Sequence, residues 1–102
     1  MTNAQNIKTT IAQLMREKQE FEPALEKAEE QYSLAFEKVL VWEEAYTTSG
    51  EDERVGQKLD EVYDEYSEAD KAMREAKVKV QSIKEALEAL YKAVEAIEWL
   101  GL

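Results

Sequence analysis

The chain has 102 residues, 23 acidic and 13 basic side chains, a formal net charge of −10, and neither cysteine nor histidine. A disulfide framework and a thiolate site are therefore excluded, and the commonest general base and zinc ligand is missing. The length suits one domain. Three glycines and one proline are too few for the many turns of an all-β protein, so these numbers favour a helical fold.

The same numbers limit the partners of the protein. No run of 18 apolar residues is present, so we expect no membrane span. The first ten residues lack the charged and apolar regions of a signal peptide, and we therefore expect a cytoplasmic protein. The acidic excess argues against direct binding to nucleic acid, because lysine and arginine are the residues that bind the phosphates.

The first predicted element is a long helix over about residues 3–46. Its apolar residues alternate spacings of four and three, which is typical of the seam of a coiled coil. Lys18 is the one interruption of this spacing. The seam residues are Ile7, Ile11, Leu14, Lys18, Phe21, Leu25, Ala28, Tyr32, Ala35, Val39, Trp42 and Tyr46.

Pro23 lies within this helix, where it removes one backbone hydrogen bond and crowds the preceding turn. The seam spacing continues through it unchanged, and position 23 falls on the outer face. We therefore expect a helix that is bent at Pro23. The alternative is a break at Glu22, which would give three helices of unequal length.

Residues 47–50, Thr-Thr-Ser-Gly, predict the connection to a second helix. Gly50 can adopt the left-handed conformation that ends a helix, and Ser49 or Thr48 can cap the next one. We expect that second helix over about residues 51–100. Its seam is unbroken and consists of Val55, Leu59, Val62, Tyr66, Ala69, Met73, Ala76, Val80, Ile83, Leu87, Leu90, Val94 and Ile97.

The two seams predict an antiparallel pair of helices, because the connection is only about four residues long. In such a pair, the numbers of two facing residues add to a constant. Trp42 with Val55 and Leu14 with Ile83 both give 97, and the intervening layers give 98. We therefore expect one all-α domain, a long antiparallel two-helix coiled-coil hairpin.

Much apolar surface lies outside this seam, and alanines line one flank, where another helix could approach closely. We expect two hairpins to pair into a four-helix bundle as a homodimer, because soluble monomers seldom expose large apolar patches. The alternative is that these residues pack locally within one hairpin. The residues assigned to an apolar interface are Phe36, Leu40, Val41, Tyr63, Trp99, Leu100 and Leu102.

Most of the negative charge falls in one segment. Residues 43–70 hold 11 acidic and two basic side chains, whereas the rest of the chain holds 12 and 11. In a hairpin this charge lies at the turn end, where carboxylates on a rigid rod can imitate the phosphates of DNA and steer a basic partner. The residues assigned to this acidic surface are Glu43, Glu44, Glu51, Asp52, Glu53, Asp60, Glu61, Asp64, Glu65 and Glu68.

These features favour a non-enzymatic inhibitor or adaptor whose acidic turn end binds the basic surface of a nucleic-acid-binding protein. One alternative is an assembly or secretion protein that acts through the apolar stem and residues 97–102. Another is a structural bundle subunit whose acids only promote solubility. We expect no catalytic, cofactor-binding or metal-binding residues, since no Gly-rich phosphate loop or EF-hand spacing occurs.

Trp42 lies near the predicted turn, and Tyr91 is followed four residues later by Glu95. In position these residues resemble the WXG100 secreted proteins, which are helical hairpins of similar length with a Trp-x-Gly turn and a Tyr-x-x-x-Asp/Glu motif. The resemblance implies a hairpin fold and a role in secretion. Here Trp42 is followed by Glu43 and Glu44, so the glycine of the first motif is replaced.

Overall fold

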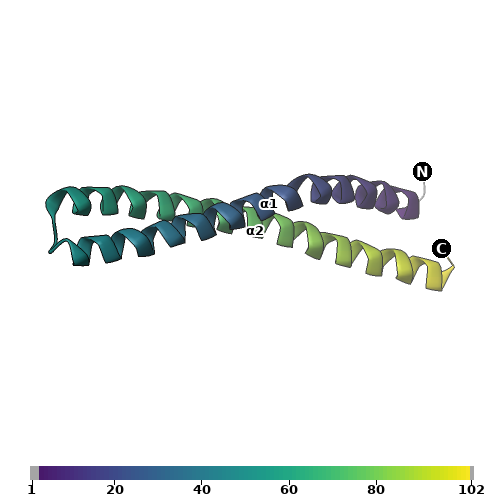
Figure 1. The fold of residues 1–102 in the computed structure, drawn as a ribbon. Helices are drawn as coiled ribbons and strands as arrows, with labels where there is room; N and C mark the ends of the chain where they lie inside the picture. Colours follow the sequence, from purple (N-terminus) through teal and green to yellow (C-terminus); the bar gives the residue numbers. More distant parts are fainter. Residues whose placement is uncertain (1–2, 102) are drawn as a thin grey trace.

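The structure, a computed structural model, describes residues 3–101 and contains two helices within them. Helix α1 (Asn3–Thr48) and helix α2 (Glu53–Leu100) lie antiparallel, and both chain ends lie at the same end of a rod (Figure 1). The rod measures 74 × 18 × 13 Å. The predicted all-α hairpin is confirmed, and each helix boundary at the turn lies two residues later than expected.

Helix α1 passes through Pro23 without a break, so the alternative of three helices is wrong. Pro23 is exposed on the outer face, where water can replace the hydrogen bond that proline cannot make. The dark-blue middle part of α1, which contains Pro23, changes direction in Figure 1, as expected for a helix bent at a proline.

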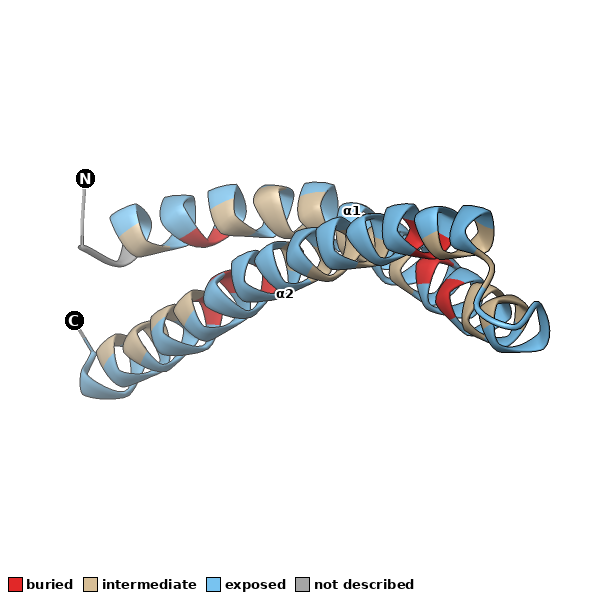
Figure 2. Ribbon diagram, turned by 90° about the vertical axis from the view of Figure 1, so that its left-hand side faces the viewer, coloured by how far each residue is buried: buried red, intermediate tan, exposed pale blue. Residues whose placement is uncertain are grey.

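The hydrophobic core is the seam predicted from the sequence. Every residue of both predicted seams is buried or half-buried. Figure 2 shows the buried positions in two groups, one toward the chain ends and one toward the turn. The core is narrow, because two helices share a single apolar stripe. Its buried residues are Ile11, Ala35, Val39, Leu59, Val62, Val80, Ile83 and Leu87.

Contacts between the helices agree with the predicted register. The hydroxyls of Tyr32 and Tyr66, whose numbers add to 98, lie 2.9 Å apart and share a hydrogen bond. Leu14 packs against the cluster that contains Ile83, its expected facing residue. The bond with Tyr32 also raises the pKa of Tyr66 above its ordinary value, since the neutral phenol is the form that donates.

Backbone hydrogen bonds close the end of α1. The N–H of Glu51 donates to the Tyr46 carbonyl at 2.9 Å, and the N–H of Gly50 donates to the Thr47 carbonyl at 3.2 Å. This pair of bonds is a Schellman motif, which needs a left-handed residue after the helix. Gly50 has φ +71°, so the conformation predicted for it is confirmed.

Asp52 caps α2, because its carboxylate accepts from the backbone N–H of Arg54 at 2.8 Å and of Val55 at 3.3 Å. The prediction that Ser49 or Thr48 caps this helix is wrong, since two left-handed residues after Ser49 delay its start. Ser49 instead bridges the turn: it donates to a carbonyl of α1 at 3.0 Å and accepts from the Asp52 N–H at 3.2 Å.

The two sides of the seam carry different rows of side chains, because flanking positions pair across an antiparallel hairpin. We call one side the tyrosine flank, where the Tyr91 hydroxyl lies 3.5 Å from the Met15 sulfur. Its row includes Met15, Phe36, Glu43, Tyr63 and Tyr91. We call the other side the alanine flank, and its row includes Ala24, Ala45, Ala72, Ala86 and Ala93.

The rod exposes more surface than a compact protein of its size. Its accessible surface is 7797 Å², whereas a globular monomer of 11.8 kDa exposes about 5,900 Å². Its radius of gyration is 22.2 Å, against about 13 Å for a compact chain of this length. Much of the molecule is therefore available for contact with other molecules.

Candidate functional site

The structure divides the rod into two halves of different charge. We define the turn half as residues 28–70 and the stem half as residues 3–27 and 71–101, since the register places the two stem segments side by side. The turn half holds 14 acidic and 3 basic side chains, a net charge of −11, and the stem half holds 9 and 10, a net charge of +1. The excess negative charge of the protein therefore lies at the turn end.

All three cations of the turn half are already paired within it. The Lys38 ammonium lies 3.4 Å from a Glu65 oxygen on the opposite helix, and Lys58 lies 3.4 Å from Glu61 on its own helix. Arg54 lies 3.6 Å from the capping carboxylate of α2. Of the remaining carboxylates of this half, Asp70 pairs with Arg74 of the stem half at 3.0 Å and Glu43 accepts from Tyr63, and the others have no cation partner among the described residues.

The outer face of α2 carries an acidic strip. Asp60, Asp64 and Glu68 follow each other at intervals of four residues and are exposed, so they lie on one side of the helix. Within residues 3–101 none of the three has an ion pair or a side-chain hydrogen bond. Like charges at this spacing repel by a few tenths of a kcal/mol per pair, and this strip therefore favours an approaching cation.

The ten acidic residues assigned from the sequence all lie in the turn half. Four are used within the protein: Asp52 caps α2, Glu43 accepts from Tyr63, and Glu61 and Glu65 pair with lysines. The other six have no side-chain partner among the described residues and are free to bind: Glu44, Glu51, Glu53, Asp60, Asp64 and Glu68.

Sequence reasoning missed three further acids of the turn half. Glu29, Glu30 and Glu37 belong to α1, outside the segment in which the charge was counted. The hairpin brings them to the same end of the rod as the acidic strip of α2. Applying the constant sum of facing residue numbers to charges, and not only to apolar residues, would have found them.

An apolar patch borders the acids on the tyrosine flank. Phe36 and Leu40 are one helical turn apart on α1 and are about half exposed, and Tyr63 of α2 is 41% exposed. The Tyr63 hydroxyl donates to Glu43 Oε1 at 2.5 Å. This hydrogen bond, followed by partial removal from water and the negative charges of Glu43 and Asp60, raises the pKa of Tyr63. Tyr63, one residue of the patch, is thus held in place by an acid beside it.

The other residues assigned to an apolar interface do not join this patch. Val41 is 62% exposed but points toward the alanine flank, next to the exposed Leu34 that sequence reasoning missed. Trp99 and Leu100 are 85% and 62% exposed at the opposite end of the rod. Leu102 lies outside the described residues. The described residues assigned to apolar contact therefore lie on three separate surfaces of the rod.

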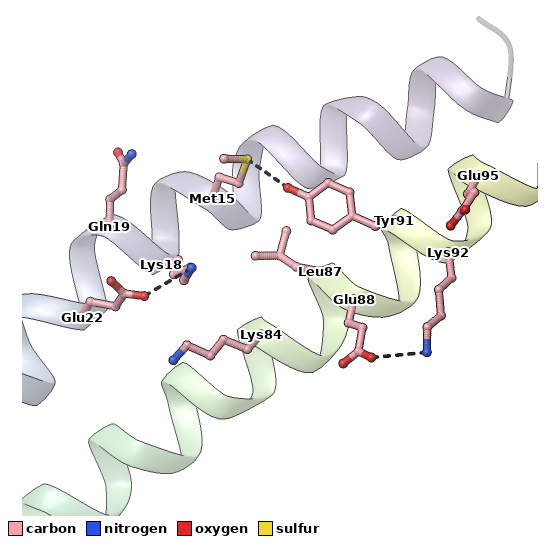
Figure 3. A pocket seen from close by; sticks show the side chains of 10 residues that line it. All are labelled: Met15, Lys18, Gln19, Glu22, Lys84, Leu87, Glu88, Tyr91, Lys92 and Glu95. Atoms are coloured by element: carbon pink, nitrogen blue, oxygen red, sulfur yellow. Dashed lines mark hydrogen bonds and ion pairs between the residues drawn. The ribbon is translucent and has the colours of Figure 1, made fainter. Parts of the chain in front are cut away.

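A groove of about 440 Å³ runs between the helices on the tyrosine flank of the stem half (Figure 3). Leu87 forms part of its lining, and Met15 and Tyr91 face each other across it. Two of its three carboxylates, those of Glu22 and Glu88, are paired with lysines of their own helices. The ion pairs of this groove are Lys18–Glu22 at 3.4 Å and Lys92–Glu88 at 3.3 Å.

A second groove, of about 800 Å³, lies on the alanine flank of the stem half. Phe21 and Ala24 of α1 and Ala72 and Ala76 of α2 line it. The Lys79 ammonium lies 4.6 Å from the centre of the Phe21 ring, a cation–π contact. Both grooves are open to solvent along the rod.

Among residues 3–101, no group of three or more acidic side chains is arranged to hold a metal ion. Over the same residues, neither helix is long and apolar enough to cross a membrane. Comparison of the chain with protein-family models, with curated proteins and with solved structures found no match. The function must therefore be inferred from the charge and shape of the rod.

Proposed function

We propose that this protein is a non-enzymatic inhibitor or adaptor whose acidic turn half binds the basic, nucleic-acid-binding surface of another protein. The observation that carries the proposal is the separation of charge along the rod, −11 in the turn half against +1 in the stem half. Solubility alone gives no reason for this separation, because like charges gathered on one helix face repel each other.

The density of charge supports a phosphate-like role. Residues 28–48 of α1 extend for about 30 Å, so the turn half carries one net negative charge per roughly 3 Å of rod. A single nucleic acid strand carries one per about 3.4 Å and duplex DNA one per about 1.7 Å. A surface built to bind a single strand therefore meets a similar charge density on this rod.

The apolar patch supplies the second part of such an interface. Phe36, Leu40 and Tyr63 form an exposed apolar centre, and acids surround it. Interfaces commonly combine a central apolar or aromatic anchor with a charged rim. In this proposal the acids accelerate the encounter with a basic protein, and the patch slows its dissociation.

The test is capture of proteins from an extract of the host cells on the immobilised full chain, with washes of rising salt. The variant Asp60→Lys/Asp64→Lys/Glu68→Lys reverses three acids that have no partner within the protein. We expect the wild-type chain to retain a basic protein that leaves at moderate salt, because screening weakens exposed charge pairs. We expect the variant not to retain it.

The matched control is Glu20→Lys/Glu26→Lys/Glu75→Lys, which makes the same change of charge on exposed acids of the stem half. We expect this control to retain the same protein as the wild type. Equal retention by the two triple variants would contradict the proposal, because it would show that the position of the charges is irrelevant.

Competition distinguishes imitation of nucleic acid from simple charge attraction. A protein held through its nucleic-acid-binding surface should be released by a single-stranded oligonucleotide added at constant ionic strength. A protein that stays bound under those conditions contacts the rod with a different surface. The full chain and the oligonucleotide would then bind together, and the inhibitor role would be wrong.

The exposure of Trp99 and Leu100 favours a second candidate function, a structural or assembly subunit that acts through the stem. The variant Trp99→Ser/Leu100→Ser separates the two functions. It should retain the captured protein if the turn half binds it, and lose it if the stem end does. The WXG100-like role in secretion belongs to this second candidate and would act through the same end.

A further inference from the structure

The last four turns of α2 present an apolar face that is only partly covered within one rod: Ala89, Ala96 and Leu100 are exposed, and Ala86 and Ala93 are half-buried. Leu100 is 62% exposed, and four alanines precede it at spacings of three and four, so the five residues lie on one side of the helix. No charged residue interrupts this series. We call it the stem-end face, and it consists of Ala86, Ala89, Ala93, Ala96 and Leu100.

We propose that the stem-end face binds the same face of a second copy of the chain, so that two rods join through their stem ends. The two α2 helices would lie antiparallel about a two-fold axis at Ala93, and the two acidic turn halves would point in opposite directions. This inference is independent of the partner proposed for the turn half.

The face is complementary to itself in this arrangement. Around an axis at Ala93, Leu100 meets Ala86 of the second copy, and Ala96 meets Ala89. The sums of facing residue numbers are 186 and 185, and they alternate by one as the sums 98 and 97 do within the hairpin. Each large side chain meets a small one, which allows the two helices to approach closely.

The neighbouring positions also match. The same register places Ile97 of α2 against Leu90 of the second copy, and both residues remain half-buried in one rod. Trp99 falls beside Lys92 of the second copy, where a cation–π contact is favourable. The two Lys92 side chains approach each other, but each is already paired with Glu88 of its own helix at 3.3 Å.

The rod as a whole exposes more surface than a compact monomer, and the stem-end face is one part of that surface. The 7797 Å² of the rod exceed the surface of a globular monomer of this mass by about 1,900 Å². A dimer of standard size buries about 800 Å² on each partner, which is less than half of this excess. The 85% exposure of Trp99 places the most exposed large apolar side chain next to the proposed contact.

Charge limits the contact to the stem ends. The contact segment, residues 86–100, holds three acids and one lysine, a net charge of −2, whereas joining the turn halves would bring together two regions of −11. Toward the turn, the same side of α2 carries charged residues, of which Lys79 is the first. The apolar layers therefore extend only from Ala86 to Leu100, about 21 Å along the helix.

The length of the dimer tests this arrangement. Sedimentation equilibrium up to millimolar chain concentration should show a rise toward twice the mass of 11.8 kDa. Small-angle X-ray scattering should show a longest dimension that rises from about 75 Å to about 125 Å. A chain that stays monomeric, or a dimer that stays about 75 Å long, would overturn the proposal.

Single cysteines test the axis directly, because the chain contains no cysteine. Ala93→Cys places two thiols next to each other across the proposed axis, within the short range that a disulfide requires. Ala72→Cys is the matched control, since Ala72 lies on the same flank of α2 but outside the contact. Under mild oxidation Ala93→Cys should become a covalent dimer, and Ala72→Cys should not. Equal rates of disulfide formation in the two variants would overturn the proposed register.

Charge at the axis provides a test in solution. Ala93→Glu and Ala93→Lys should each be monomeric, because like charges would meet at the axis, and an equimolar mixture of the two should dimerise again. Circular dichroism should show unchanged helix content in both variants, since Ala93 is only half-buried. Dimerisation of Ala93→Glu alone, or no dimer in the mixture, would show that the contact lies elsewhere.

Discussion

The turn half and the stem half have the same architecture but different surfaces. In both, a single seam of apolar residues joins α1 to α2, and each half contains four of the buried residues described for the rod. The turn half adds a capped connection and a charge of −11, whereas the stem half is nearly neutral and ends in exposed Trp99 and Leu100. The seam specifies the fold, and the residues outside it make the two ends different.

Two leucines, one in each half, test whether both ends of the seam are equally closed. Leu59 in the turn half and Leu87 in the stem half are both buried. We expect Leu59→Ala and Leu87→Ala each to lower the free energy of unfolding by about 2–5 kcal/mol, because each leaves a cavity in a narrow core. Urea unfolding followed by circular dichroism measures both. If Leu87→Ala lowered the free energy of unfolding by less than about 1 kcal/mol, the stem half would be open in solution.

Pro23 removes a backbone hydrogen bond from α1 in the stem half, and the turn half contains no proline. Replacing it therefore changes the stability of the stem half only. Pro23→Ala restores a backbone hydrogen bond on the exposed face of α1. We expect it to raise the free energy of unfolding by up to about 3 kcal/mol, the cost of proline in a helix interior. Thermal unfolding compares the variant with the wild type. A loss of stability would mean that the bend is needed for the seam to close.

The cap at Asp52 is specific to the turn half. Asp52→Ala leaves the backbone N–H groups of Arg54 and Val55 without their acceptor. We expect a loss of about 1 kcal/mol, typical of an N-cap, while Asp52→Asn should lose less because its amide oxygen can still accept. Thermal unfolding of the two variants measures both losses of stability. Equal losses would show that the side chain at position 52 does not cap α2.

The smallest expected effect concerns Tyr63. Its hydrogen bond to Glu43 favours the neutral phenol and raises its pKa in the folded protein. This contribution to stability is therefore complete below the ordinary tyrosine pKa of about 10 and is lost as the pH rises through the raised value. Above pH 10 the wild type should lose stability relative to Tyr63→Phe. Melting curves across this range would contradict the assignment if the two proteins changed in parallel.

The fold was predictable because the seam spacing carries most of the information about it. Leu14 and Ile83, far apart in the sequence, were paired by number alone, and Tyr32 and Tyr66 meet as the sum of 98 requires. Apolar spacing constrains both the helices and their register, since a shifted register would expose the seam.

The cap of α2 and the limits of the candidate site were harder to predict. Glu51 adopts φ +64°, an uncommon conformation for a residue other than glycine, and this moves the start of α2 to the residue after Asp52. The bond between Tyr63 and Glu43 depends on side-chain conformations that no spacing rule contains. Hydrophobic pattern predicts which faces meet, but not which exposed polar groups meet beside them.

The length of the rod has a consequence for how its two ends communicate. At physiological ionic strength the Debye length is about 8 Å, so the tips of a 74 Å rod are separated by roughly nine screening lengths. A molecule bound at one tip cannot sense the electrostatic field of the other. Any coupling between the two tips must pass mechanically along the helices, and occupancy of one tip should otherwise leave affinity at the other unchanged.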